Sequence, residues 1–251
     1  RYAHLGTGNY NPRTAKVYTD FSLFTADPEV TADVGQLFNV LTGNLAAPTF
    51  RHVLVAPFDL HRRMVALIGA EAAAARAGRP SGIFAKVNSL VDPLIIDALV
   101  RASQAGVPIE LVVRGVCCLV PGVPGRTETI RVRSVLGRFL EHSRVFRFHN
   151  HGGDPVLLLG SADWMQRNFV RRVECVFPVR DPALRRRLEQ EVIPTYLGKV
   201  GDVTFLRADG SHAPADPAGR AAPCIQDTFL ALAARQAPAG KRAKLRPRKG
   251  S

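Results

Sequence analysis

The stretch IFAKVNSLVDPLIIDALVRASQAGVPIELVV, residues 83–113, predicts the fold of the chain. Its first five and last five residues are short apolar runs, typical of buried strands. Between them, Asp92-Pro93 predicts the start of a helix and Gly106 its end. A strand, helix and strand of this length form a right-handed parallel crossover, so the sequence indicates an α/β fold.

The two predicted strands of this unit end in polar residues. The first ends in Lys86-Val87-Asn88-Ser89 and the second in Arg114-Gly115. Because ligands of open α/β sheets bind outside the carboxyl ends of the strands, we expect functional groups at this edge.

The same patterns predict the other elements. Expected strands or extended segments lie at 2–5, 14–24, 53–56, 145–148, 156–159 and 173–177, and expected helices at 28–41, at 60–77 and from 182 onward. Residues 130–140 fit a helix or a strand. Residues 209–223 have the composition of a linker, and 224–235 predict a short amphipathic helix. The basic stretch 241–249 is typical of a solvated tail rather than a dedicated binding arm.

Composition limits the class of protein. The chain has 251 residues, a hydrophobic fraction of 46% and a formal net charge of +13. This length and hydrophobicity predict one large or two small folded domains. The charge favours a polyanionic partner, which could be nucleic acid, an anionic membrane surface or a phosphate-rich substrate. The four cysteines lack the spacing of a zinc site, so we expect reduced, buried thiols in a cytoplasmic protein.

The sequence shows no membrane or export signal. No apolar run approaches the roughly 20 residues of a membrane helix, and no signal peptide opens the chain, although peripheral membrane association stays open. The first residue is Arg1, and residues 1–4 have the character of the inside of a strand. We therefore expect a fragment.

His142 and Ser161 are the candidates for chemistry. His142 precedes the predicted strand at 145–148, and Ser161 follows the one at 156–159, so two neighbouring strands would bring both residues to one sheet edge. Gly160-Ser161 also repeats the plan of Gly6-Thr7, in which a strand end is followed by a glycine and a hydroxyl. We expect phosphate chemistry at this edge.

A histidine followed by a Gly-Ser turn and an asparagine resembles the phospholipase D superfamily, whose two halves each supply a histidine to one phosphoryl site. Arg144 stands where that superfamily has a lysine, and no matching aspartate is found. A closer resemblance, from residue 1 to about residue 205, is to bacterial polyphosphate kinases of the first type. The blocks that carry it are HLGTGNYN (4–11), YTDFS (18–22), KVNSLVD (86–92), VRGVCC (113–118), IRVRS (130–134), FLEHSR (139–144) and GSADWM (160–165).

The resemblance implies an α/β fold of mixed sheets flanked by helices, phospholipase D-like, with most of one such domain truncated at the N-terminus. It implies that residues 1–52 end a first catalytic domain, that 53–207 form a second domain, and that 208–251 form a linker, a short helix and a basic tail. The implied activity is that of an ATP:polyphosphate phosphotransferase. The γ-phosphate of ATP moves reversibly onto a histidine and then onto polyphosphate, with Mg²⁺ assisting.

The resemblance also implies roles for single residues. His142 and Arg114 match catalytic positions and, with Tyr18, the nucleotide-binding positions of the family. The phosphorylated histidine and the magnesium-associated arginines of the family lie upstream of the HLGTGN block. No metal ligand is therefore expected in this chain, and His4 matches a second family histidine instead of the phospho-acceptor. The resemblance implies ATP or ADP and polyphosphate as ligands, a homo-oligomer as the intact assembly, and a fragment that is inactive alone.

Each of these three residues has a simpler interpretation. Arg114 could form a surface ion pair instead of binding phosphate oxygens bidentately. His142 could be a buried structural histidine instead of a phosphate donor or acid–base group. Tyr18 could be a half-buried aromatic residue instead of a platform for adenine.

Other basic and aromatic side chains are also ambiguous. Lys86, Arg131 and Arg133 could extend a positive path for polyphosphate, or the two arginines could form one solvated strand face. Trp164 fits a core or loop anchor better than a ligand platform.

Two other functions stay open. The chain could be a non-catalytic polyanion-binding remnant or, less favourably, a phospholipase D-like nuclease. Arg144 and the missing first histidine argue against the nuclease, and no specific nucleic-acid partner is expected.

Overall fold

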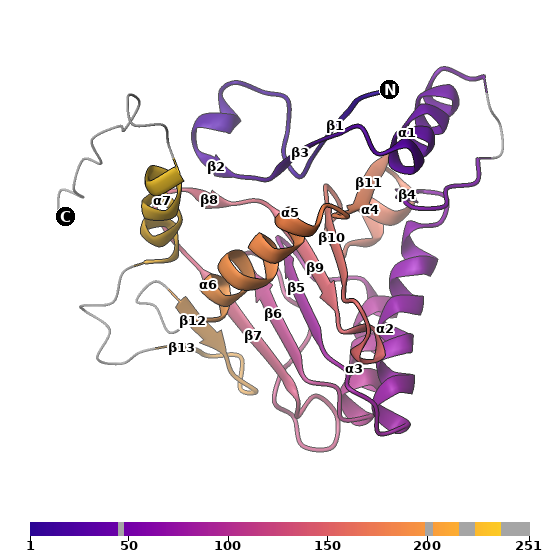
Figure 1. The fold of residues 1–251 in the computed structure, drawn as a ribbon. Helices are drawn as coiled ribbons and strands as arrows, with labels where there is room; N and C mark the ends of the chain where they lie inside the picture. The colour runs from indigo at the N-terminus through magenta and orange to yellow at the C-terminus, as the bar shows by residue number, and fades with distance from the viewer. Residues whose placement is uncertain (45–47, 199–202, 216–223, 237–251) are drawn as a thin grey trace.

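A computed structural model describes residues 1–44, 48–198, 203–215 and 224–236 of the chain (Figure 1). Its main strands are β4 (Leu54–Ala56), β5 (Ile83–Val87), β6 (Ile109–Val113), β7 (Ile130–Val135), β9 (Arg144–Phe148), β10 (Val156–Gly160), β11 (Glu174–Pro178), β12 (Val203–Leu206) and β13 (His212–Pro214). Within the described residues they form one nine-stranded sheet in the order β13-β12-β7-β6-β5-β9-β10-β11-β4. The neighbours β5, β6 and β7 are parallel, and the other pairs are antiparallel.

Helices cover both faces of this sheet. α2 (Leu60–Arg76) and α3 (Pro93–Gln104) lie on one face, and α5 (Pro182–Arg187), the π-helical turn η3 (Leu188–Val192) and α6 (Ile193–Leu197) lie on the other (Figure 1). The side chains of β5 alternate accordingly, with Ala85 in the core under α2 and α3 and Phe84 in the opposite core. The sheet is therefore a middle layer between two hydrophobic cores.

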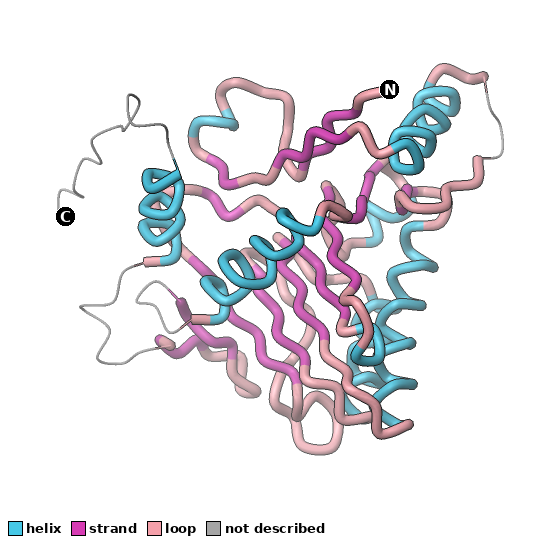
Figure 2. Tube along the Cα trace, viewed as in Figure 1, coloured by secondary structure: helices cyan, strands magenta, loops and turns pink. Residues whose placement is uncertain are grey.

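The N-terminal segment lies along one edge of this layered body. β1 (Ala3–Gly6) pairs antiparallel with β3 (Ser22–Thr25), and α1 (Pro28–Leu41) follows. β2 (Tyr18–Thr19) pairs in parallel with β8 (Leu140–Glu141), a short strand between β7 and β9 (Figure 2). The remaining elements are η1 (Thr14–Lys16), η2 (Asn150–Gly152), α4 (Gln166–Val170) and α7 (Ile225–Gln236).

Three helices begin at Asp-Pro pairs. The side chain of Asp27 accepts backbone N–H groups at the start of α1, Asp92 does so for α3, and Asp181 does so for α5. Each aspartate satisfies donors that have no partner within the helix, and the proline after it has a backbone angle that suits the first turn. These helix starts confirm the sequence prediction.

The α/β fold class and the parallel β5-α3-β6 unit are confirmed. Residues 130–135 are a strand, which resolves the ambiguous segment. The expected linker at 209–223 is wrong in part, because β13 pairs with β12 and extends the sheet. The expected helix at 224–235 is α7, while 216–223 and the basic stretch 241–249 lie outside the described residues.

Two further expectations concern cysteines and membrane spans. Cys117, Cys118 and Cys175 form no disulfide. Cys118 is exposed, so the expectation of buried thiols is wrong there, whereas burial raises the pKa of the Cys175 thiol to about 12. No helix in the described ranges is long and apolar enough to cross a membrane.

Candidate active site

His142 lies in the short link between β8 and β9, and its side chain is only 13% exposed. Its Nδ1 lies 3.0 Å from each carboxylate oxygen of Asp20. The ring of Tyr18 lies against the imidazole, with 4.8 Å between the ring centroids. The parallel β2–β8 pair produces this arrangement, because it places Tyr18 beside Leu140 and so brings the residues after β2 to His142.

The turn after β1 fixes the Asp20 carboxylate. The Thr7 hydroxyl donates to Asp20 Oδ1 at 2.7 Å, and the backbone N–H of Phe21 donates back to Thr7 Oγ1 at 2.9 Å. A Cβ on Gly8 would lie 2.3 Å from Asp20 Oδ2, so the carboxylate needs a glycine at that position. The N-terminal turn therefore positions the carboxylate that contacts His142.

Arg144 is a buried structural partner of the site. Its Nη2 donates to Asp163 Oδ2 at 2.8 Å and its Nε to Asp163 Oδ1 at 3.1 Å, which makes a bidentate ion pair. Its Nη1 donates to the backbone oxygen of His142 at 2.9 Å and to that of Thr7 at 3.1 Å. Arg144 thus fixes the backbone on two sides of the histidine.

Arg114 follows β6 and reaches the same site through Asn88. Arg114 Nε donates to Asn88 Oδ1 at 3.0 Å, and Asn88 Nδ2 donates to the backbone oxygen of His142 at 3.1 Å. Asn88 therefore joins the carboxyl ends of β5 and β6 to the histidine. In the described part of the chain no acidic group forms an ion pair with Arg114, so the surface ion pair considered from the sequence is absent there.

The expected positive path through Lys86 and Arg133 is wrong, because both side chains are buried and paired. Lys86 is 2% exposed, and its Nζ lies 3.2 Å from Glu141 Oε2. Arg133 Nη2 lies 2.8 Å from Glu110 Oε2, and the exposed Arg131 also pairs with Glu110, at 3.4 Å. Neither a free positive path nor a simple solvated arginine face is present.

Ser161 lies at the same sheet edge as His142 but does not contact it. Gly160 pairs with Arg144 across β10 and β9, which confirms the common edge. The Ser161 hydroxyl donates to Glu174, and the backbone N–H of Cys175 donates to Ser161 Oγ at 3.2 Å. Burial raises the pKa of Glu174 above its ordinary value, although the hydrogen bond from Ser161 lowers it. Ser161 therefore serves a buried structural turn.

A cavity of about 430 Å³ opens beside Tyr18. Aromatic and aliphatic side chains form much of its wall, among them Tyr18, Phe139, Tyr196, Phe229 and Leu230. An apolar cavity with a few polar groups at its edge suits a flat, partly polar ligand.

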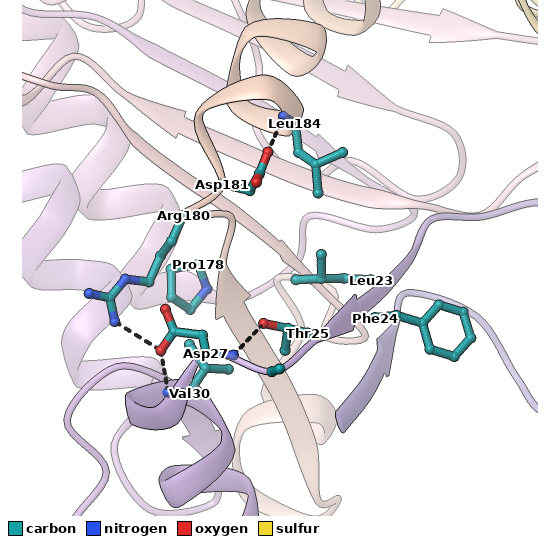
Figure 3. Close-up of a pocket in the computed structure, with 10 residues that line it drawn as sticks. Leu23, Phe24, Thr25, Asp27, Val30, Pro178, Arg180, Asp181 and Leu184 are labelled. Carbon is teal, nitrogen blue, oxygen red and sulfur yellow. Dashed lines mark hydrogen bonds and ion pairs between the residues drawn. The ribbon is translucent and has the colours of Figure 1, made fainter. Parts of the chain in front are cut away.

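A second cavity, of about 550 Å³, lies between β3 and α1 on one side and the start of α5 on the other (Figure 3). Its acidic residues already have structural partners. Asp27 Oδ1 accepts from Arg180 at 3.4 Å and from the backbone of Val30 at 3.1 Å, and Asp181 accepts from the backbone of Leu184 at 2.9 Å. We therefore place the candidate site at His142.

Two family models match the chain over most of its length. One, described as "Polyphosphate kinase C-terminal domain 2", matches residues 53–222, and the other, "Polyphosphate kinase C-terminal domain 1", matches residues 1–47. The chain belongs to the polyphosphate kinase family. The resemblance inferred from the motif blocks is thereby confirmed, and the chain is part of an enzyme family.

Individual polyphosphate kinases agree with this assignment. The polyphosphate kinase of Pseudomonas aeruginosa is 51% identical over 223 residues, which are 89% of this chain and 32% of that protein. That of Synechocystis sp. is 51% identical over 218 residues, 87% of this chain and 30% of that protein. The crystal structure of polyphosphate kinase from Porphyromonas gingivalis matches with a TM-score of 0.86 at 34% identity and covers 93% of this chain and 36% of that one. The chain thus spans about a third of the length of these polyphosphate kinases.

Within this chain the structure brings the three residues expected to bind nucleotide into one region. Tyr18 contacts His142 directly, and Arg114 reaches it through Asn88. His4 has a separate environment, since its ring stacks on Phe24 with 4.4 Å between centroids. Trp164 is fully buried and packs on Phe146, which confirms its interpretation as a core residue.

Sequence reasoning assigned no role to Asp20 or Asp163, and it placed Asn88 only at a strand end where functional groups were expected. Asp20 and Asn88 stand inside the quoted blocks YTDFS and KVNSLVD, and Asp163 inside GSADWM, so the blocks themselves carried the signal. Among the described residues no group of three or more His, Cys, Asp and Glu side chains could hold a metal ion. We assign these residues no step through Mg²⁺.

Proposed function

We propose that this chain carries the nucleotide-phosphate side of the site for ATP:polyphosphate phosphotransfer through a phosphohistidine. The observation that supports the proposal is the cluster in which His142 contacts Asp20 and is joined through Asn88 to Arg114, which has no acidic partner in the described part of the chain. A guanidinium with unused donors at the end of a strand can bind phosphate oxygens.

The proposed roles follow from the contacts. With a proton on Nδ1, His142 donates to the Asp20 carboxylate, which fixes the tautomer and the direction of the ring. Nε2, which lies 3.2 Å from Arg144 Nη1, is then the proposed acid–base atom that exchanges a proton with phosphate oxygens. Arg114 offsets charge on the phosphoryl group as the bond between the β- and γ-phosphates breaks and a bond to the nucleophilic histidine nitrogen forms. A second transfer passes the phosphoryl group from that histidine to the end of a polyphosphate chain.

The cavity beside Tyr18 is the proposed place for the adenine base. Tyr18 and Phe139 contribute to its wall, and the same Tyr18 ring contacts His142. A base bound there would direct its phosphates towards His142, which contacts the Tyr18 ring. Aromatic side chains favour flat bases because stacking is attractive and excludes water.

We propose that these 251 residues bind nucleotide without forming polyphosphate by themselves, because the resemblance places the nucleophilic histidine outside them. The domain division, the homo-oligomer, the cytoplasmic location and the assistance of Mg²⁺ stay predictions.

The test is calorimetric titration of the chain with ATP and with polyphosphate, and in parallel with duplex DNA, at two salt concentrations. All polyanions bind a basic protein more weakly as salt rises, so the preference at the higher salt is informative. We expect ATP and polyphosphate to bind more tightly than DNA. Equal binding of all three would favour the polyanion-binding remnant, and tighter binding of DNA would contradict the proposal.

Substitutions locate the binding. Arg114→Ala and His142→Ala should each weaken ATP binding about tenfold or more, as expected for the loss of a hydrogen bond to a charged group. Arg131→Ala and His52→Gln are matched controls, because Arg131 is 72% exposed and the His52 side chain pairs with Glu29, at 3.6 Å. Both controls should bind ATP like the unsubstituted chain.

A further inference from the structure

Gln226 is a buried polar residue in the first turn of α7, and it is bound to the segment that carries His142. It is 3% exposed. The backbone N–H of Phe139 donates to Gln226 Oε1 at 2.7 Å. Gln226 Nε2 donates to the backbone oxygen of Phe139 at 2.8 Å and to Glu141 Oε1 at 2.8 Å. The amide oxygen and the amide nitrogen of Gln226 therefore both form hydrogen bonds with residues just before His142.

The segment is shaped to receive this side chain. A Cβ on Gly137 would lie 2.6 Å from Gln226 Oε1, so any larger residue there would displace the amide. Ile225, the neighbour of Gln226, is fully buried. Figure 1 shows α7 beside β8, far along the chain from it. The helix is thus an integral part of the site and not an appendage after a linker.

Glu141 is the centre of the contacts behind the histidine. It receives hydrogen bonds from Gln226 and from the Tyr196 hydroxyl, the latter at 2.8 Å, and pairs with Lys86 at 3.2 Å. Burial alone would raise the pKa of Glu141, but Lys86 and the two hydrogen bonds outweigh it and lower the pKa. Lys86 also donates to the backbone oxygen of Ser143 at 2.8 Å. Residues on both sides of His142 are thus bound to one buried network.

The alternation of an extended chain explains why this network controls His142. Side chains of successive residues point to opposite sides, so fixing residues 139, 141 and 143 directs residue 142 the other way. β8 has only two residues, and two backbone hydrogen bonds join its segment to that of β2, from the Leu140 N–H to Val17 at 2.8 Å and from the His142 N–H to Thr19 at 3.3 Å. The side-chain bonds of the buried network add to this short pairing.

We propose that Gln226 is a positioning residue, which sets the direction of His142 by fixing Phe139 and Glu141. The C-terminal helix α7 is then a working part of the phosphotransfer site. This proposal adds a residue to the proposed function. It rests on that function only in the measurement of ATP affinity.

The test compares Gln226→Ala and Gln226→Glu with Gln104→Ala in the 251-residue chain. Gln104 is an exposed glutamine at the end of α3 that donates to the Gly125 backbone oxygen, at 3.2 Å, and is a matched control for the loss of a glutamine side chain. Two properties are measured: the NMR titration of the His142 ring with pH, and the affinity for ATP. The ring is faced by Asp20 and Tyr18 from the β2 segment and by Arg144 from β9, so a change in its direction changes its titration.

We expect Gln226→Ala to shift the His142 titration midpoint and to weaken ATP binding about tenfold, whereas Gln104→Ala changes neither. Gln226→Glu can still accept from Phe139 but cannot donate to Glu141 when ionised. It should therefore resemble the alanine variant at pH 8 and recover towards the unsubstituted chain as pH falls and the new carboxyl group regains its proton.

A Gln226→Ala chain that folds and shows the same His142 titration and ATP affinity as Gln104→Ala would overturn the proposal. If Gln226→Ala does not fold, Gln226→Glu is the deciding variant. An ATP affinity at pH 8 equal to that of the unsubstituted chain would then overturn the proposal. If the unsubstituted chain does not bind ATP, the proposed function fails, and the His142 titration alone still tests the positioning role.

Discussion

The turns Gly6-Thr7 and Gly160-Ser161 each place a hydroxyl side chain after a glycine. In both turns the hydroxyl donates to a carboxylate, but the two carboxylates have different surroundings. Thr7 donates to Asp20 at 2.7 Å, and Ser161 donates to Glu174. The Asp20 side chain is 22% exposed and faces His142, while that of Glu174 is 9% exposed, with Arg172 at 3.7 Å. The first turn thus holds a partly exposed carboxylate against His142, and the second holds a more buried one inside the fold.

This difference shows that the repeated motif is a scaffold and not a site by itself. Arg144 joins the two turns, since it donates to the Thr7 backbone oxygen at 3.1 Å and pairs with Asp163, which follows Ser161, at 2.8 Å. Only the turn that faces the His142 segment takes part in the candidate chemistry.

The largest expected effect comes from breaking the link between the turns. Asp163→Ala leaves the buried Arg144 guanidinium without its counter-charge, and removal of one partner from a buried ion pair costs about 3–5 kcal/mol of unfolding free energy. Urea denaturation followed by circular dichroism measures the loss. The control is Asp97→Ala, which removes the exposed partner of Arg101 and should cost less than about 1 kcal/mol. Equal losses in the two variants would show that Arg144 does not join the turns.

The second-largest expected effect distinguishes the carboxylate of Asp20 from that of Glu174. Asp20→Asn removes the charge that His142 contacts, and a hydrogen bond to a charged group contributes about 1.5–3 kcal/mol, so ATP affinity should fall about tenfold to a hundredfold. Glu174→Gln is the matched change at the other turn and should alter ATP affinity less than about twofold. Calorimetric titration gives both values. A larger fall in affinity for Glu174→Gln would reverse the assignment of the turns.

The smallest expected effect is a change in folding stability with pH, and it comes from Glu174 at the buried turn. Burial raises the pKa of Glu174 above its ordinary value of 4.5, so the folded chain binds that proton more tightly than the unfolded chain. The contribution of Glu174 to stability therefore falls as pH rises above 4.5 towards the raised pKa. The melting temperature of Glu174→Gln minus that of the unsubstituted chain should increase from pH 4 to pH 8. A difference that decreases over this range would show that the carboxylate is held ionised.

Local signals predicted much of the fold. The helix starts at Asp27, Asp92 and Asp181 depend on neighbouring residues only, and so do the apolar strands of the central sheet. For the same reason the β5-α3-β6 unit could be predicted, because short crossovers of this kind have one handedness.

The contacts that complete the site could not be predicted because they join distant segments. Asp20 and His142 are 122 residues apart, and Gln226 lies 87 residues from Phe139. The expected place of Lys86 on a positive path was wrong for the same reason, since its burial depends on Glu141 and Ser143, which belong to another strand region. One sequence contains no signal for such pairs beyond the presence of polar residues in the quoted blocks.

We propose that ATP phosphates bind at Arg114, which Asn88 joins to His142, and the ATP titration of Arg114→Ala against Arg131→Ala tests this most directly. Both variants remove one arginine from the basic surface, but Arg131 already pairs with Glu110, at 3.4 Å, while Arg114 contacts the neutral Asn88. The account predicts that affinity falls about tenfold or more for Arg114→Ala and stays unchanged for Arg131→Ala. Equal affinities in the two variants would contradict it.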